Sequence, residues 1–166
     1  MKKTQSGRSM VEMLGVLAII GVLSVGGLAG YSMGMSRYRV NRTISDVQLL
    51  LTNVRTLYAN QSTYNGLTAD SLVTMGILTS EKQNLFGGAI DVKADTDKSR
   101  FTVEYKKIPA KSCSSIMSSD WGTANDGLVS IQAGSATART SFPVSVTDAA
   151  TDCGTSGDVD MVWIYQ

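Results

Sequence analysis

Histidine is absent from this chain of 166 residues. Its absence excludes zinc sites built on imidazole and nucleophiles activated by a serine–histidine pair. The glycine fingerprints of phosphate and dinucleotide binding are also missing. Asp95 and Asp97 lie in a polar turn flanked by lysines, which favours a solvated loop over an acid–base pair. The sequence therefore predicts a protein that is not an enzyme and that needs no cofactor or metal.

Charge is absent from a long N-terminal stretch. No charged residue occurs from Met13 to Ser36, which is 24 positions. As an α-helix this stretch would be roughly 36 Å long, against about 30 Å for the hydrocarbon core of a bilayer. Arg37, Arg39 and Arg42 then mark an exit into water. The pattern predicts an N-terminal membrane anchor.

A cleaved secretory signal is the alternative to an anchor. Such a signal also has a basic start, an apolar core and small residues at the cleavage site, for which Gly27-Leu28-Ala29 would serve. The apolar stretch exceeds the roughly 7–15 residues of such a core, and an acid at its head is unusual. These features favour the anchor.

Basic residues flank both ends of the apolar stretch, so charge alone does not decide which end of the anchor faces the cytoplasm.

The segment before the anchor combines a basic leader with a lone acid. The leader runs from Met1 to Gly7, and Glu12 follows five residues after Gly7. The stretch Gly7–Leu23 resembles the processing and assembly signature of type IV prepilins. The resemblance implies that prepilin peptidase cuts after Gly7 and that Glu12 supports assembly. In that family the new N-terminus, here Arg8, is commonly N-methylated. Arg8 stands where that family usually has phenylalanine, methionine or another apolar residue.

A carboxylate at the position of Glu12 is costly in lipid unless it reaches a surface or a partner. In a bundle of such helices, the α-amine of Arg8 from a neighbouring subunit would be a suitable cation. A slip in axial register would leave both charges unpaired, at a cost of about 3–5 kcal/mol. The alternative is a carboxylate that reaches the cytoplasmic interface without a partner. The spacing from Gly7 favours the assembly role.

Glycine is frequent in the anchor, and three of its glycines recur at four-residue steps. Gly26, Gly30 and Gly34 form a small-xxx-small face, which lets helices approach closely in lipid. Each glycine also costs about 1 kcal/mol of helix propensity relative to alanine. We therefore hypothesise that the helix extends or melts near Gly26–Gly30 when subunits enter a filament. Glycines that are simply tolerated in a membrane helix are the alternative.

Beyond the anchor, apolar residues keep a helical spacing, which predicts one helix of roughly 50 residues that ends at Asn60-Gln61-Ser62. We predict an α+β fold in which this long N-terminal helix, half in membrane and half packed, lies against a small antiparallel β-sheet. The expected division is a leader at 1–7, a transmembrane and filament-core half-helix at 8–36, and a periplasmic or extracellular globular domain at 37–166. The apolar positions with helical spacing are Ile44, Val47, Leu50, Leu51, Val54, Leu57 and Tyr58.

Five segments show the alternation and the β-branched or aromatic content of strands. Pro143 indicates that its strand lies at a sheet edge. Short helices are expected at Thr68–Leu78 and around Cys113–Asp120. The five strand segments are Ala89–Lys93, Phe101–Ile108, Leu128–Gln132, Phe142–Val146 and Val159–Tyr165.

Two short pieces, Tyr64–Thr68 and Asn84–Ile90, resemble the loop and first strand of type IVb pilins, especially the conjugative and enteric kind. The chain has two cysteines, Cys113 and Cys153. With the leader in the cytoplasm they face the bacterial periplasm, where disulfides persist. Type IV pilins have a comparable C-terminal disulfide that bounds an exposed, variable region, so the resemblance implies a Cys113–Cys153 bond. Two buried free thiols are the alternative.

The small net charge of +1 conceals a division along the chain. Residues 37–111 hold eleven basic and seven acidic residues, a net charge of +4, whereas residues 112–166 hold one basic residue and six acidic ones, a net charge of −5. One hypothesis is that neighbouring subunits stack the acidic region of one against the basic region of the next, in contacts that salt would weaken. An ordinary solvated surface is the alternative.

The leading interpretation is a type IV pilus subunit for adhesion, aggregation or conjugative contact, held in the bacterial inner membrane before it joins an extracellular pilus. Its expected partners are further copies in a helical filament, prepilin peptidase, the assembly machinery of the inner membrane and an outer-membrane secretin. A pseudopilin of a type II secretion system and a membrane-anchored periplasmic binding domain that never polymerises are the alternatives. The two cysteines favour the pilin.

Overall fold

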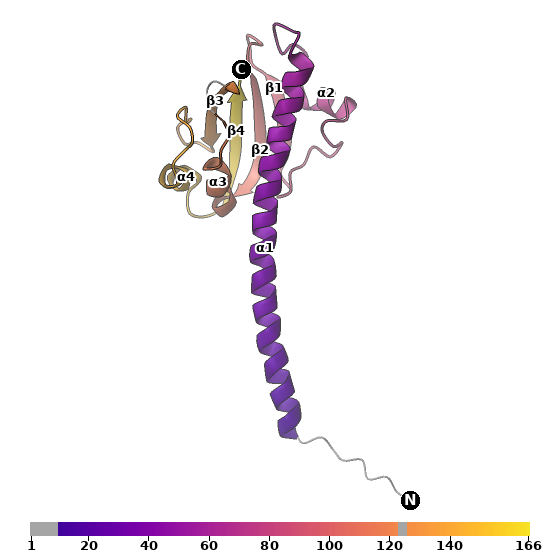
Figure 1. Cartoon of the computed structure of the whole chain (residues 1–166), viewed down its shortest axis with the longest axis vertical. Coiled ribbons are helices and arrows are strands. Elements are labelled where there is room, and N and C mark those ends of the chain that lie inside the picture. The colour runs from indigo at the N-terminus through magenta and orange to yellow at the C-terminus, as the bar shows by residue number, and fades with distance from the viewer. Residues whose placement is uncertain (1–9, 123–125) are drawn as a thin grey trace, which may run out of the picture. The chain divides into compact units, whose positions relative to one another are not determined.

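The structure is a computed structural model that describes residues 10–122 and 126–166. These residues form two compact units, one ending at Tyr38 and one running from Arg39 to Gln166. Figure 1 labels the elements along the chain. Their bounds are α1 Met10–Tyr58, α2 Ala69–Thr74, β1 Ile90–Ala94, β2 Phe101–Pro109, α3 Ala110–Met117, β3 Leu128–Ala133, α4 Val146–Cys153 and β4 Asp158–Tyr165.

Helix α1 has 49 residues, which confirms the predicted long N-terminal helix. Its glycines do not interrupt it, although each lowers helix propensity. Within the Arg39–Gln166 unit, its second half buries Val47, Leu50 and Val54 and leaves its other faces in water. This half is therefore amphipathic, and its apolar stripe forms part of the domain core.

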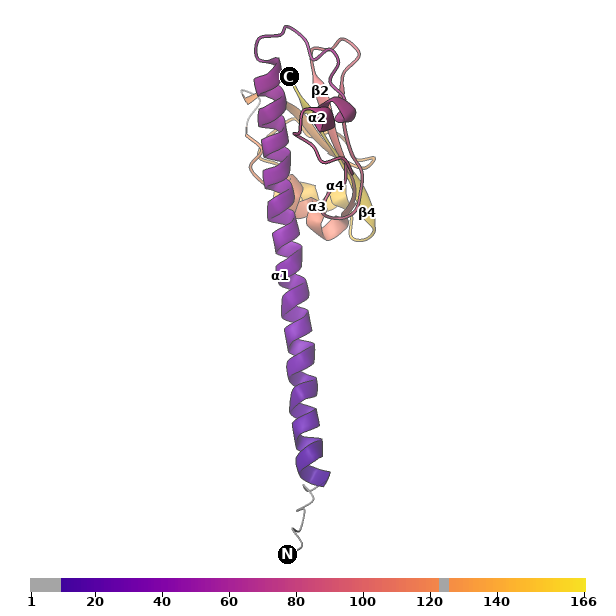
Figure 2. The same ribbon diagram turned by 90° about the vertical axis from the view of Figure 1, so that its right-hand side faces the viewer.

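Four strands form one antiparallel sheet in the order β1-β2-β4-β3. The central pair β2 and β4 aligns Phe101 with Tyr165 and Val103 with Trp163. The side chains of these four residues are buried, whereas the residues between them are half-exposed, as the period of two requires. The Arg39–Tyr58 part of α1 covers the buried face of the sheet (Figure 2).

Each of the two outer strands, β1 and β3, has a short bridge to another segment along its outer edge. Beside β1, Thr68 forms an isolated bridge with Lys93. Beside β3, the main chains of Ile131 and Arg139 exchange two hydrogen bonds of 3.0 and 2.8 Å. Because an unpaired edge is a template for further strands, these bridges limit uncontrolled extension of the sheet.

Four of the five predicted strands are present, each within one residue of its predicted bounds. The fifth prediction is wrong: Phe142–Val146 is not a strand, and so Pro143 does not mark an edge strand. Its last residue begins helix α4 instead. Ser145 is the N-cap of that helix, and its hydroxyl accepts a hydrogen bond of 3.1 Å from the Asp148 N–H.

The two predicted short helices are present with shifted bounds. Helix α2 is shorter than the predicted Thr68–Leu78 segment because Gly76, at a φ of +73°, follows its C-cap residue. Thr68 caps its N-terminus, where it exchanges hydrogen bonds with Ser71. Helix α3 begins directly after Pro109, three residues earlier than the predicted helix around Cys113–Asp120.

Candidate functional site

The apolar half of α1 is the first candidate surface. In the unit that ends at Tyr38, every described residue from Met10 to Gly34 has an exposed side chain. This helix is long and apolar enough to cross a membrane, with a mean hydropathy of 2.2 over 18 residues and none of that window buried. A signal sequence near the N-terminus can have the same length and composition.

Glu12 is the only acidic residue in the first turn of this helix. Its side chain is exposed, and no basic residue within 10–122 and 126–166 forms an ion pair with it. The predicted processing residues Gly7 and Arg8 lie outside the described residues. The position of Glu12 at a helix N-terminus is electrostatically favourable, because the unpaired N–H groups there carry partial positive charge.

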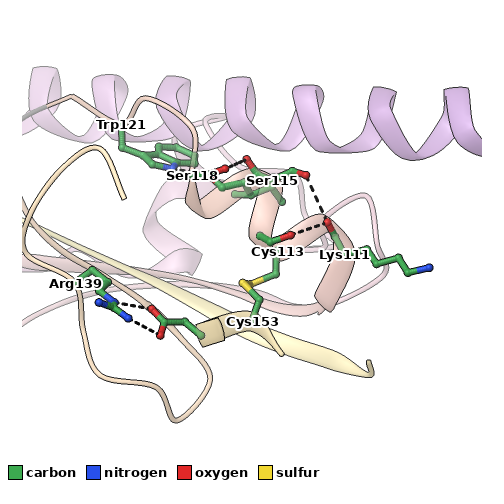
Figure 3. The surroundings of a disulfide bond; sticks show 10 residues. Lys111, Cys113, Ser115, Ser118, Trp121, Arg139 and Cys153 are labelled. Carbon is green, nitrogen blue, oxygen red and sulfur yellow. Dashed lines mark hydrogen bonds and ion pairs between the residues drawn. A yellow bond between two sulfur atoms is a disulfide. The ribbon is translucent and has the colours of Figure 1, made fainter. Parts of the chain in front are cut away.

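The second candidate region is bounded by a disulfide. Cys113 on α3 is bonded to Cys153 on α4, with their Cα atoms 5.8 Å apart, which confirms the predicted disulfide. Both residues are buried, and the bond closes a separation of 40 residues. Figure 3 shows the bond linking α3 to the end of α4. It fixes the two helices to each other beside the sheet.

An ion pair beside the disulfide was not predicted from the sequence. The Arg139 guanidinium donates two hydrogen bonds to the Asp152 carboxylate, of 2.7 Å from Nε and 2.9 Å from the terminal nitrogen (Figure 3). The hydrogen bonds from Arg139 lower the pKa of Asp152 below its usual value. The one basic residue of the acidic C-terminal region thus joins the edge of β3 to helix α4.

The sequence indicates that Arg139 has an acidic partner, but not which aspartate that partner is. Arg139 is the sole cation among six aspartates in residues 112–166, so a partner within that region was a reasonable expectation. Which aspartate it would contact depends on the bridge between Arg139 and Ile131, which is a long-range contact that local pattern does not reveal. Asp148, at 3.4 Å from the guanidinium, is a second and more exposed partner.

A long N-terminal helix, a four-stranded antiparallel sheet under its second half and a disulfide-bonded C-terminal region together define the type IV pilin fold. Two solved structures share this fold. A type IVb pilin from Salmonella typhi matches with a TM-score of 0.59 and 20% identity, over 74% of this chain and 97% of that one. TcpA, a type IV pilin from the El Tor biotype of Vibrio cholerae, matches with a TM-score of 0.56 and 11% identity, over 78% of this chain and 99% of that one.

No curated protein sequence matches the chain. The bundlin family, however, matches residues 35–165, which is nearly all of the Arg39–Gln166 unit together with residues 35–38 before it. The chain belongs to the bundlin family of type IVb pilins. This is a family of structural pilins rather than of enzymes.

Proposed function

We propose that this protein is a structural subunit of a type IV pilus that is cleaved after Gly7 and polymerises through its apolar N-terminal helix. The observation that carries the proposal is the contrast between a helix with no buried side chain in its apolar part and a carboxylate, Glu12, at its head. Exposed apolar surface of this extent needs lipid before assembly and other helices after it. Membership of a pilin family supports the same interpretation.

In the proposed filament, residues 8–36 of many copies form an apolar core and residue Glu12 pairs with the α-amine of Arg8 from a neighbour. An unpaired carboxylate inside such a core is strongly unfavourable, so the pair would define the axial register. Residues 37–166 would lie outside the core and form the surface that makes contact for adhesion, aggregation or conjugation. Prepilin peptidase, the inner-membrane assembly machinery and an outer-membrane secretin are the proposed partners, and the proposed location moves from the inner membrane to the cell surface.

The experiment is to replace Glu12 by Ala in cells that carry the assembly system, with Glu12→Asp as the conservative control. We expect Glu12→Ala to leave the amount of membrane-bound subunit unchanged and to abolish filaments in electron micrographs. Normal filaments from Glu12→Ala would contradict the proposed role of Glu12 in assembly. If the wild-type chain never formed filaments, the protein would instead be a membrane-anchored domain that does not polymerise. Long surface fibres would separate a pilin from a pseudopilin that forms a short periplasmic structure.

The mass of the mature N-terminal peptide tests the processing step. Cleavage after Gly7 gives a peptide that begins at Arg8, with the added mass of one methyl group if the amine is methylated. A mature chain that begins at Met1, or near Gly30, would contradict the proposal.

A further inference from the structure

The chain contains a single asparagine–glycine pair, Asn65 and Gly66, in the loop between α1 and α2. The two residues form the centre of a tight turn, because the Leu67 N–H donates a hydrogen bond of 3.2 Å to the Tyr64 carbonyl. Gly66 has a φ of +81°, which suits the third position of a type II turn. Asn65 and Gly66 are both exposed, so the turn presents a side-chain amide and the next main-chain nitrogen to water.

An asparagine that precedes a glycine can lose ammonia without an enzyme. The main-chain nitrogen of the glycine attacks Cγ of the asparagine, the bond from Cγ to Nδ2 breaks, and ammonia leaves with the proton of the main-chain N–H. Water then opens the resulting cyclic imide at either of its two carbonyl groups, which gives aspartate or isoaspartate. Glycine favours the attack because it has no Cβ to hinder close approach. Water is the only other reactant.

The nucleophile of this reaction is not occupied in the folded domain. Among the residues that the structure describes, none accepts a hydrogen bond from the Gly66 N–H. A Cβ added at Gly66 would meet no atom within 4 Å, so there is room around the turn for the ring to form. The fold therefore leaves the nitrogen accessible instead of protecting it.

The electrophile, in contrast, is held by a cation. The Lys98 Nζ donates a hydrogen bond of 2.6 Å to Asn65 Oδ1. Attack on the amide carbon moves negative charge onto this oxygen, and a donor that is already in place stabilises that charge. An exposed lysine is an ammonium ion at neutral pH, which donates hydrogen bonds but has no lone pair with which to attack the amide itself.

The folded domain brings these two residues together across 33 positions of sequence. The loop after α1 and the turn between β1 and β2 lie side by side (Figure 1). The main chain of Lys98 is fixed at both of its polar groups: its N–H donates 3.0 Å to the Asp95 carbonyl, and its carbonyl accepts 2.8 Å from the Tyr64 N–H. Such fixed placement of a donor is what distinguishes a promoted reaction from that of a free peptide.

Asn84 provides a comparison within the same chain. It is 9% exposed, its amide nitrogen donates a hydrogen bond of 2.7 Å to the Lys106 carbonyl, and its amide oxygen accepts from two main-chain N–H groups. The residue that follows it is not a glycine. Both ends of the Asn84 amide are therefore fixed, whereas the Asn65 amide is bound through its oxygen alone among the described residues.

We propose that Asn65 of the folded protein is a site of deamidation, through a cyclic imide with Gly66, and that Lys98 accelerates the attack by binding the amide oxygen. The product carboxylate forms beside the Lys98 ammonium, so that an ion pair replaces the hydrogen bond. The net charge of residues 37–111 falls from +4 to +3. The reaction needs only the folded domain and water, so the inference goes beyond the proposed function and does not depend on it.

The first test incubates the purified full chain in micelles at mildly alkaline pH. Peptide mass spectrometry at successive times measures conversion, since exchange of an amide for a carboxyl group changes the mass. We expect Asn65 to convert and Asn84 to remain intact. Aspartate and isoaspartate peptides should both appear and separate on chromatography, because water opens the imide at two carbonyls. An intact Asn65, or aspartate without isoaspartate, would overturn the proposal.

The variant Lys98→Met tests the part played by the ammonium group. We expect conversion in the folded chain to slow about tenfold, less than the roughly hundredfold loss for a donor in an enclosed site, because Lys98 is exposed. In urea the wild type and the variant should convert at the same rate, because unfolding separates Lys98 from Asn65. The matched control is Lys111→Met, since the Lys111 side chain is exposed and forms no ion pair among the described residues. Its rate should equal that of the wild type.

Three further outcomes would overturn the proposal. The first is equal conversion of the wild type and Lys98→Met in the folded chain, or the same slowing in urea as in the folded chain. The second is equal slowing by Lys98→Met and Lys111→Met, which would show a general effect of charge. The third is a joined pair of peptides that contains Asn65 and Lys98 and has lost ammonia, because the lysine itself would then be the nucleophile. None of these outcomes bears on filaments, so failure of this inference is distinguishable from failure of the proposed function.

Discussion

The two parts of helix α1 have the same secondary structure and opposite environments. From Met10 to Gly34 every side chain is exposed, although the segment is almost entirely apolar. From Arg39 to Tyr58 the apolar residues on one face are buried in the domain core, and polar residues occupy much of the rest. One continuous helix therefore combines a part that the chain's own core stabilises with a part that needs surroundings the single chain does not supply.

The contrast separates stability from assembly. Residues of the second part contribute to the free energy of folding of the globular unit, because their burial removes apolar area from water. Residues of the first part bury nothing within the unit that ends at Tyr38, so substitutions there should alter membrane insertion or filament packing. The predictions below test this separation, from the largest expected effect to the smallest.

Removal of the disulfide should give the largest effect, confined to the globular unit. We expect the Cys113→Ser, Cys153→Ser double variant to lose about 4 kcal/mol of unfolding free energy, from the entropy of a closed loop of this length. Denaturant unfolding of the full chain in detergent micelles measures it. The amount of helix that remains in the anchor at the end of the transition should not change. If the helix in the first part of α1 unfolded together with the globular unit, the separation of the two parts would be contradicted.

A matched pair of leucine substitutions in α1 compares the parts directly. Leu50 is 4% exposed, so Leu50→Ala should destabilise the globular unit by about 3 kcal/mol through a cavity and lost burial. Leu17 is 61% exposed, so Leu17→Ala should leave the unfolding free energy of that unit unchanged. The same micelle unfolding experiment measures both. Equal destabilisation by the two variants would show that the apolar first part of α1 contributes to the domain core.

The sequence predicted this division because its two signals are local. The first part of α1 is recognised as a continuous run of residues without charge. The second part is recognised by apolar residues spaced three and four positions apart, such as Val47, Leu50 and Val54. Strands with regular alternation, such as Phe101–Ile108, were also predicted well. In both cases the side chains that form the core follow directly from the period of the element.

The wrong strand at Phe142–Val146 shows where such reasoning fails. Phe142 and Val144 alternate as in a strand, and Val144 is indeed buried, but the segment joins the core as a loop. The stronger signal was Ser145 with Asp148 three residues later, a pairing typical of a helix N-terminus. The choice of Asp152 as the partner of Arg139 was beyond prediction, because it depends on a bridge to β3 that forms only in the folded domain.

The Arg139–Asp152 pair predicts a smaller, pH-dependent effect within the globular unit. Because the folded pKa of Asp152 is lowered, its contribution to stability is complete above the unfolded value of about 3.9. It is lost as the pH falls through the folded pKa. Asp152→Asn should therefore lower the melting temperature at pH 7 by less than loss of the disulfide does, and its deficit should shrink as the pH falls below about 4.

Thermal unfolding of the full chain in micelles at a series of pH values measures this effect. The control is Asp158→Asn, because Asp158 forms no ion pair with any residue in the part of the chain that the structure describes. Its melting curves should follow those of the wild type at each pH. A deficit for Asp152→Asn that is the same at pH 3 and pH 7 would show that the ion pair contributes nothing.

Gly30→Ala should have the smallest effect on the single chain and a distinct one on the assembly. A methyl group at Gly30 meets no atom within 4 Å, so the subunit can accommodate it. Alanine should raise local helix stability by about 1 kcal/mol, without a change in the melting of the globular unit. Slower hydrogen exchange in the first part of α1, measured in micelles, would detect this change.

If Gly30 lies where helices approach closely in the filament, the same methyl group should reduce filament yield. Gly15→Ala, also in open space and outside the Gly26, Gly30, Gly34 face, is the matched control for that yield. Unchanged filaments with Gly30→Ala would mean that the glycine is only tolerated, and the assembly role would then rest on the apolar side chains of the anchor and on Glu12.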